Sequence, residues 1–171
     1  FINRVVHVTG RDLFPPRPFA IVTWNYPESF SYTNAEVSAV WEDIKADNKF
    51  WLNLIAYPDA EDALKLLSRF AIAGNDVYFI TSRPGVAAKL QTERWLKRHG
   101  YLPTATVLIS SQKGKCVSAL QCDKYIDDRW ENALDVAMTT GSEVYLLDRS
   151  WNQRRETPTG IRRIDSLIEM F

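Results

Sequence analysis

The chain has 171 residues, of which 46% are hydrophobic and 25% charged, as in one globular domain of ordinary size or a core with a small appendage. Its 21 basic and 21 acidic residues balance, so the basic excess of a broad nucleic-acid-binding surface is absent. No apolar run approaches the roughly 18 residues of a membrane span, and we therefore expect a soluble, cytoplasmic protein without a membrane partner.

Residues 1–58 are predicted to form a small helical cap. Two segments in this part, FINRVVHVTG (1–10) and NAEVSAVWEDIKA (34–46), carry apolar residues at helical spacing, and Asn34 is the expected N-cap of the second. Packing inside the cap is the ordinary interpretation of its many aromatic residues. A ligand platform is the other interpretation, because an aromatic side chain can stack on a nucleobase.

Four short runs in the rest of the chain are predicted strands. They are too short for helices, and they are apolar throughout instead of alternating between apolar and polar residues. This pattern is typical of strands that are buried on both faces of a parallel sheet. The runs are DVYFIT (76–81), TATVLIS (104–110), KYID (124–127) and EVYLLD (143–148).

Helical segments separate these strands. The expected helices cover residues 59–74, 85–100, 113–121 and 129–141, with a last helix over 164–171. Leu90 and Trp95 are expected to face the core from the second of them. Strands that alternate with helices predict an α/β fold, a Rossmann-like, doubly wound parallel sheet over residues 59–171.

Polar side chains follow three of the predicted strands. Because the carboxyl ends of parallel strands meet at one edge of a sheet, where ligands bind, we expect these groups to gather there. They are Thr81, Ser82 and Arg83 after the first strand, Ser110 with Lys113 or Lys115 after the second, and Asp127 with Asp128 after the third.

Each of these groups has an ordinary interpretation beside a functional one. Asp127 and Asp128 can cap the following helix, bind Mg²⁺ through carboxylate oxygens, or form an acid–base pair. The hydroxyls near residue 82 can belong to a plain turn or to a phosphate cradle at a helix N-terminus. A lysine near residue 113 can lie in solvent or neutralise phosphate charge. The order of hydroxyl, lysine and paired aspartates at successive strand ends favours the functional interpretation.

This ordered set resembles the haloacid dehalogenase superfamily of phosphohydrolases, and in particular its 5′(3′)-deoxyribonucleotidase-like branch. VYFITSRP (77–84) is similar to motif II of the family, Lys113 to motif III, and YIDDR (125–129) to motif IV. VYLLDRSWN (144–152) is similar to the next strand and loop, and residues 1–58 to the helical insertion cap.

The resemblance implies roles for these residues. Thr81 and Lys113 would hold the transferring phosphoryl oxygens, and Ser82 and Arg83 would line the mouth of the site. Asp128 would be the direct Mg²⁺ ligand, while Asp127 would bind through water or hold the geometry. Trp24 and Tyr26 would shape the substrate pocket.

One motif of the family has no counterpart here. The family carries an Asp-x-Asp strand whose first aspartate attacks phosphorus and whose second acts as acid and base. The resemblance places this strand immediately before the cap helix that begins at Phe1, and no segment of the sequence matches it. We expect the strand upstream of Phe1; a partner chain or another segment is the other possible source.

Two functions therefore stay open at this level. The first is a Mg²⁺-dependent phosphomonoesterase that acts through an aspartyl phosphate on a small phosphorylated substrate, such as a (deoxy)nucleoside monophosphate. The second is a non-catalytic phosphate- or nucleotide-binding module that has lost the nucleophile. A nucleic-acid contact through the arginines near the C-terminus competes poorly, because such arginines are usually solvated or paired.

Overall fold

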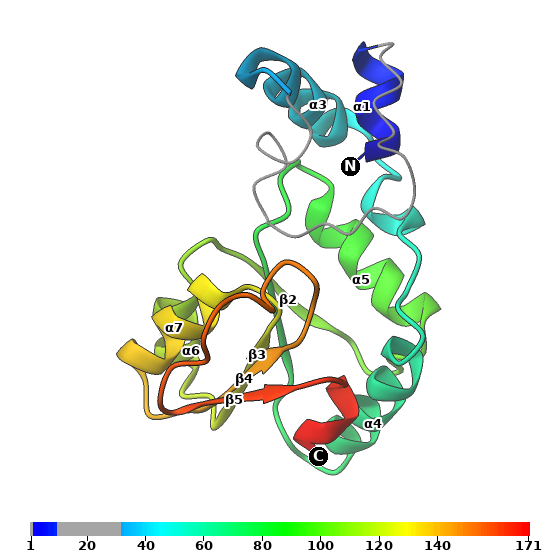
Figure 1. The fold of residues 1–171 in the computed structure, drawn as a ribbon. Coiled ribbons are helices and arrows are strands. Elements are labelled where there is room, and N and C mark those ends of the chain that lie inside the picture. Colours follow the sequence, from blue (N-terminus) through cyan, green and yellow to red (C-terminus); the bar gives the residue numbers. More distant parts are fainter. Residues whose placement is uncertain (1, 10–31) are drawn as a thin grey trace.

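The computed structural model describes residues 2–9 and 32–171 of the chain (Figure 1). Trp24 and Tyr26, the predicted pocket aromatics, lie outside the described residues. The two predicted cap helices are confirmed as α1 (Ile2–Thr9) and α3 (Asn34–Ala46), which pack together at one end of the molecule (Figure 1). None of the described helices is long and apolar enough to cross a membrane.

The N-cap of α3 is Thr33 and not the predicted Asn34. The Thr33 hydroxyl accepts a hydrogen bond from Glu36 N at 3.2 Å, and the Glu36 carboxylate accepts one from Thr33 N at 2.8 Å. This reciprocal capping box satisfies two backbone donors at once, whereas a cap at Asn34 would satisfy one.

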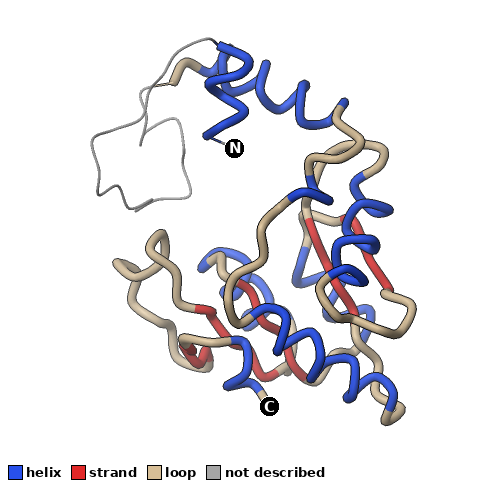
Figure 2. Tube along the Cα trace, turned by 90° about the vertical axis from the view of Figure 1, so that its right-hand side faces the viewer, coloured by secondary structure: helices blue, strands red, loops and turns tan. Residues whose placement is uncertain are grey.

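All five strands of the described chain are parallel to their neighbours, as the apolar runs predict. Three of them, β3, β4 and β5, form one sheet in that order, while β1 pairs with β2 in a second sheet. Their bounds are β1 (Tyr78–Thr81), β2 (Thr106–Ile109), β3 (Lys124–Asp127), β4 (Glu143–Leu147) and β5 (Ile161–Ile164). The fold is therefore α/β with parallel strands, but the described strands form two small sheets and not one continuous sheet (Figure 2).

The break in the sheet falls between β1 and β3. Within the described part of the chain β1 pairs with β2 alone and β3 with β4 alone, so each keeps one unpaired edge. The two sheets nevertheless contact one another through side chains, because Ile80 of β1 packs against the apolar cluster that contains Val117 and Tyr125.

The C-terminal segment differs from the prediction of one helix over 164–171. Residues Ile161–Ile164 form β5 instead, and a short 3₁₀-helix, η2 (Leu167–Met170), follows. Ser166 begins this helix as an N-cap and forms a capping box with Glu169. Because the helical turn starts only after Ser166, Ile164 is left to pair with Leu147 of β4.

The remaining helices cover the two sheets. Helices α6 and α7 pack on each other, and both contribute to the apolar cluster built on β3 and β4, whereas α4 and α5 belong to the cluster around Val107 of β2. Their bounds are α4 (Ala60–Ile72), α5 (Ala88–Arg98), α6 (Lys113–Leu120) and α7 (Trp130–Thr139), with a 3₁₀-helix η1 (Trp51–Asn53) before α4.

Helix α5 turns a partly polar face inward. Leu90, predicted to face the core, is 48% exposed, whereas Gln91 and Thr92 are buried. The reason is the segment beside it. The Gln91 amide accepts hydrogen bonds from Trp51 N at 2.8 Å and Leu52 N at 3.3 Å, and donates one to Asp47 O at 3.0 Å. Three backbone groups of the link between cap and core are thus satisfied by one buried side chain.

Candidate functional site

The acidic pair lies where β3 ends. Three donors hold the Asp127 carboxylate: Arg129 N at 2.8 Å on Oδ1, and the Tyr125 hydroxyl at 2.6 Å and Asn132 Nδ2 at 3.0 Å on Oδ2. The backbone contact from Arg129 forms a local turn just before α7, whose N-cap residue is Arg129 and has no side-chain capping bond. Asp127 is therefore fixed by its own strand and by the start of α7, with most of its acceptor capacity used.

Asp128 is held differently, through its backbone. Its carbonyl oxygen accepts hydrogen bonds from Trp151 Nε1 at 3.1 Å and Asn152 Nδ2 at 2.8 Å. Its carboxylate forms no ion pair with a lysine or arginine of the described chain. Burial and then the charge of Asp127 raise the pKa of Asp128 to about 6. This carboxylate is thus available to a cation that would cancel its repulsion with Asp127.

Lys113 is buried at the first turn of α6, where it is only 3% exposed. Its ammonium has no hydrogen-bond partner among the described residues. Burial lowers the pKa of Lys113, and the charge of nearby Asp127 partly offsets this effect. Lys115, the other lysine considered for phosphate, is exposed. The structure therefore separates the two lysines, and Lys113 alone lies beside the acidic pair.

The residues after β1 form a turn that is tied to β2. Thr81 O accepts a hydrogen bond from Ser110 N at 2.8 Å, and the Ser82 hydroxyl donates to Ser110 O at 3.1 Å. The Thr81 hydroxyl accepts from Arg83 N at 3.3 Å. The two predicted hydroxyls consequently end neighbouring strands, but Ser82 is exposed and its hydroxyl is engaged with the backbone.

Arg83 faces the link between cap and core. Its guanidinium donates to the Thr92 hydroxyl at 3.0 Å and lies over the Trp51 ring, with 5.2 Å from Cζ to the ring centroid. Burial lowers the pKa of Arg83 to about 10. Trp51 is fixed in turn, because its Nε1 donates to Pro84 O at 3.1 Å. An aromatic residue, Trp51, thus lies beside the turn after β1.

The sequence analysis missed a second group of site residues, which lies after β4. Asn152 and Trp151 bind the Asp128 carbonyl, and Arg149 lies over the ring of Tyr57 at 4.5 Å from the centroid. The Arg149 charge also reaches Asp128, where it opposes the rise in pKa. The family resemblance includes residues 150–152, but it gave no role to their side chains. The local sequence does not predict a hydrogen bond between residues that are 24 positions apart.

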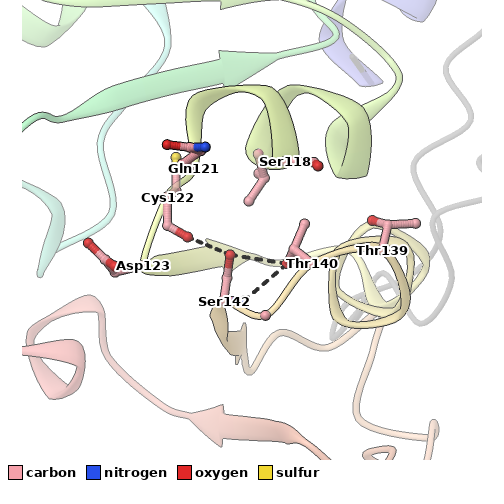
Figure 3. Close-up of a pocket in the computed structure, with 9 residues that line it drawn as sticks. Ser118, Gln121, Cys122, Asp123, Thr139, Thr140 and Ser142 are labelled. Carbon is pink, nitrogen blue, oxygen red and sulfur yellow. Dashed lines mark hydrogen bonds between the residues drawn. The ribbon is translucent and has the colours of Figure 1, made fainter.

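A separate pocket of about 420 Å³ lies at the other end of the strands (Figure 3). Its lining includes Cys122 and Ser142, which precede β3 and β4, together with hydroxyls from the ends of α6 and α7. The Ser142 hydroxyl donates to Cys122 O at 2.6 Å, and Thr140 donates to Ser142 Oγ at 3.1 Å (Figure 3). None of the predicted site residues lines this pocket.

Comparison with known proteins does not assign the chain to a class. No protein-family model matches the sequence, and neither the curated proteins nor the solved structures contain a match. The chemistry of the site is therefore inferred from the contacts of its own residues.

Proposed function

We propose that the protein is a Mg²⁺-dependent phosphomonoesterase of the haloacid dehalogenase type that acts on a small phosphorylated substrate. One observation carries the proposal: the Lys113 ammonium is buried near Asp127, at the end of β3, and has no hydrogen-bond partner within the described part of the chain. An unpaired buried charge is costly, so its retention indicates an anionic group that binds there.

The neighbouring groups suit a phosphoryl anion. Thr81 is the last residue of β1 and carries a hydroxyl. The residue before it, Ile80, packs against the apolar cluster that contains Val117 of α6, so β1 and α6 contact the same cluster. Lys113 is in the first turn of α6, where backbone N–H groups also favour negative charge. A hydroxyl, an ammonium and backbone donors would thus share the oxygens of one small anion, where fixed charges stabilise phosphoryl transfer.

The acidic pair has the donor set that Mg²⁺ prefers. The ion is bound in phosphoryl-transfer sites by one or two carboxylates together with phosphate oxygens. Asp128 would bind it directly, because its carboxylate is free of ion pairs, while Asp127 holds the local geometry through its three donors. When bound, the metal would neutralise charge on the phosphoryl oxygens.

The proposed nucleophile is an aspartate of an Asp-x-Asp motif, which none of the described segments matches. The free edges of β1 and β3 support a strand that pairs with both of them and carries the Asp-x-Asp motif to the same end of the sheet. In the proposed reaction the first aspartate of that strand attacks phosphorus and the alcohol of the substrate leaves. Water then hydrolyses the aspartyl phosphate and releases inorganic phosphate.

The substrate would enter between the turn after β1 and the cap. Arg83, stacked on Trp51, keeps guanidinium donors beyond its bond to Thr92, which suits an anionic or planar substrate such as a (deoxy)nucleoside monophosphate. Ser82, Trp24 and Tyr26 stay predictions for the mouth and the pocket of the site.

Phosphate release from a panel of sugar phosphates and nucleoside monophosphates tests the proposal. We expect release by the full-length protein that requires Mg²⁺ and is lost in Asp128→Asn. Binding of a nucleotide without any release would support the alternative, a non-catalytic module. Release that is unchanged in Asp128→Asn would remove the acidic pair from the mechanism.

A further inference from the structure

We infer that Asn152 is a positioning residue that fixes Asp128, the proposed metal ligand, by holding its backbone carbonyl. The inference rests on the proposed function, because it assigns Asn152 a role at the same site. Asn152 lies in the loop between β4 and β5 and is 1% exposed. A carboxamide buried to this degree needs partners for each of its polar groups.

Asn152 has a complete set of partners. Its Nδ2 donates to Asp128 O and to Leu147 O, both at 2.8 Å. Its Oδ1 accepts from Arg163 Nη1 at 2.7 Å and from Arg149 N at 3.2 Å. A carboxamide has two N–H donors and two acceptor positions, and all four are used here. The opposite orientation of the amide would place its oxygen against two carbonyls and its N–H groups against two donors.

The position of Asn152 explains why an amide is needed here. The last paired residues of β3 and β4 are Asp127 and Leu146, and the two strands part after them. Asp128 and Leu147 are the next residues, and their carbonyls both point to Asn152 Nδ2. The Asn152 side chain therefore bridges the two backbones where their pairing ends, because it donates one hydrogen bond to each. The backbone from which the Asp128 carboxylate extends is fixed by this contact.

Asn152 is itself held by a charged side chain. Arg163 of β5 forms an ion pair with Asp148 Oδ1 at 2.5 Å and donates to Arg155 O at 2.9 Å, in addition to its bond to Asn152. Trp151 adds a second, independent donor to Asp128 O at 3.1 Å. The Asp128 carbonyl thus accepts two hydrogen bonds from side chains of the loop after β4.

The discriminating substitution is Asn152→Asp, which keeps the shape and replaces Nδ2 by an oxygen that repels both carbonyls. Mn²⁺ alone is the probe, because this ion prefers oxygen ligands as Mg²⁺ does and its binding is followed by electron paramagnetic resonance. We expect Asn152→Asp to bind Mn²⁺ about 10- to 100-fold more weakly than the wild type, as for other partners of metal ligands. The carbonyl ¹³C resonance of Asp128 should shift as well. Asn75→Asp is the matched control. Asn75 lies just after α4, and among the described residues its side-chain amide donates to Phe70 O.

Trp151→Phe keeps the inference testable if Asn152→Asp does not fold, because it removes the other donor to Asp128 O and should weaken Mn²⁺ binding in the same direction. If the wild type binds Mn²⁺, Asp128→Asn does not, and both loop variants bind as the wild type does, the role of Asn152 is overturned while the proposed function stands. If the wild type shows no Mn²⁺ binding that depends on Asp128, the proposed metal site and this inference fail together.

Discussion

The Tyr125 hydroxyl donates a hydrogen bond of 2.6 Å to Asp127 Oδ2, so the residue two positions before the acidic pair holds its first member. Successive residues of a strand point to opposite faces, and residues two apart therefore share a face. Tyr125 and Asp127 meet for this reason, while Asp128 leaves the strand. The two adjacent aspartates consequently have different environments, one fixed by donors and one free to bind a cation.

Tyr125→Phe should weaken the site by releasing Asp127. The hydroxyl bonds to a carboxylate in a buried place, so its loss is expected to lower the free energy of unfolding by about 1.5 to 3 kcal/mol. Mg²⁺ should also bind more weakly. Urea denaturation and isothermal titration with Mg²⁺ measure the two effects. Tyr145→Phe is the matched control, because the Tyr145 hydroxyl bonds to Glu143 Oε1 at 2.5 Å at the opposite end of the strands. Equal Mg²⁺ affinity in Tyr125→Phe and wild type would contradict the prediction.

Stability should fall as the pH rises through the pKa of Asp128. Burial raises this pKa to about 6, above its value near 4 in the unfolded chain, so the folded state binds the proton more tightly. The contribution of this proton is present below about pH 4 and is lost as the pH rises to about 6. Asp128→Asn should lack this component of the pH dependence. Millimolar Mg²⁺ should restore stability above pH 6 in the wild type alone, because the ion binds the charged carboxylate. The urea midpoint of unfolding, determined across this pH range with and without Mg²⁺, measures both effects. The same pH dependence in the wild type and in Asp128→Asn would contradict the prediction.

Lys113→Met should separate stability from function. The substitution keeps the length of the side chain and removes a buried charge that has no hydrogen-bond partner among the described residues. The free energy of unfolding is therefore expected to stay the same or rise. Phosphate release should fall by about a hundredfold or more, because a fixed charge on the transferring group is lost. Lys115→Met, at an exposed position two residues further along α6, should change neither quantity. A large loss of stability in Lys113→Met would show that the ammonium has a structural partner.

Much of the fold was predictable because its strands are short and apolar throughout. The prediction for KYID coincides with β3, and the apolar run ends where the polar contacts of Asp127 begin. The strand IRRI (161–164) was missed because two arginines interrupt its apolar residues. Among the described strands β5 is at the edge of its sheet, next to β4, and Arg162 is exposed there. Leu90 was misplaced because hydrophobic spacing does not reveal that the inward face of α5 bonds to a backbone segment through Gln91.

The site divides in the same way. Thr81 and Asp127 can be assigned to the last positions of their strands from the sequence, because the apolar runs that mark β1 and β3 end there. The burial of Lys113, in contrast with Lys115, depends on tertiary packing, and the role of Asn152 depends on a contact with a residue 24 positions away. Neither follows from local spacing, so these parts of the site required coordinates.

Gly114→Ala should test how closely α6 and α7 must approach. A Cβ at Gly114 would lie 2.3 Å from Thr139 Oγ1 and 2.8 Å from Asp135 Oδ2, the atom that accepts a hydrogen bond from Gly114 N at 2.8 Å. Either these two side chains must rotate away, which breaks the hydrogen bond from Gly114 N, or the helices must separate, and we expect a loss of about 1 to 3 kcal/mol in the free energy of unfolding.

Gly141→Ala is the control for this substitution, since a Cβ at Gly141 meets no atom within 4 Å. Its stability in urea should match the wild type. Adding Thr139→Ala to Gly114→Ala removes the closer of the two clashes and should recover part of the loss. If Gly114→Ala is as stable as Gly141→Ala, the two helices can accommodate a Cβ at Gly114, and the prediction is wrong.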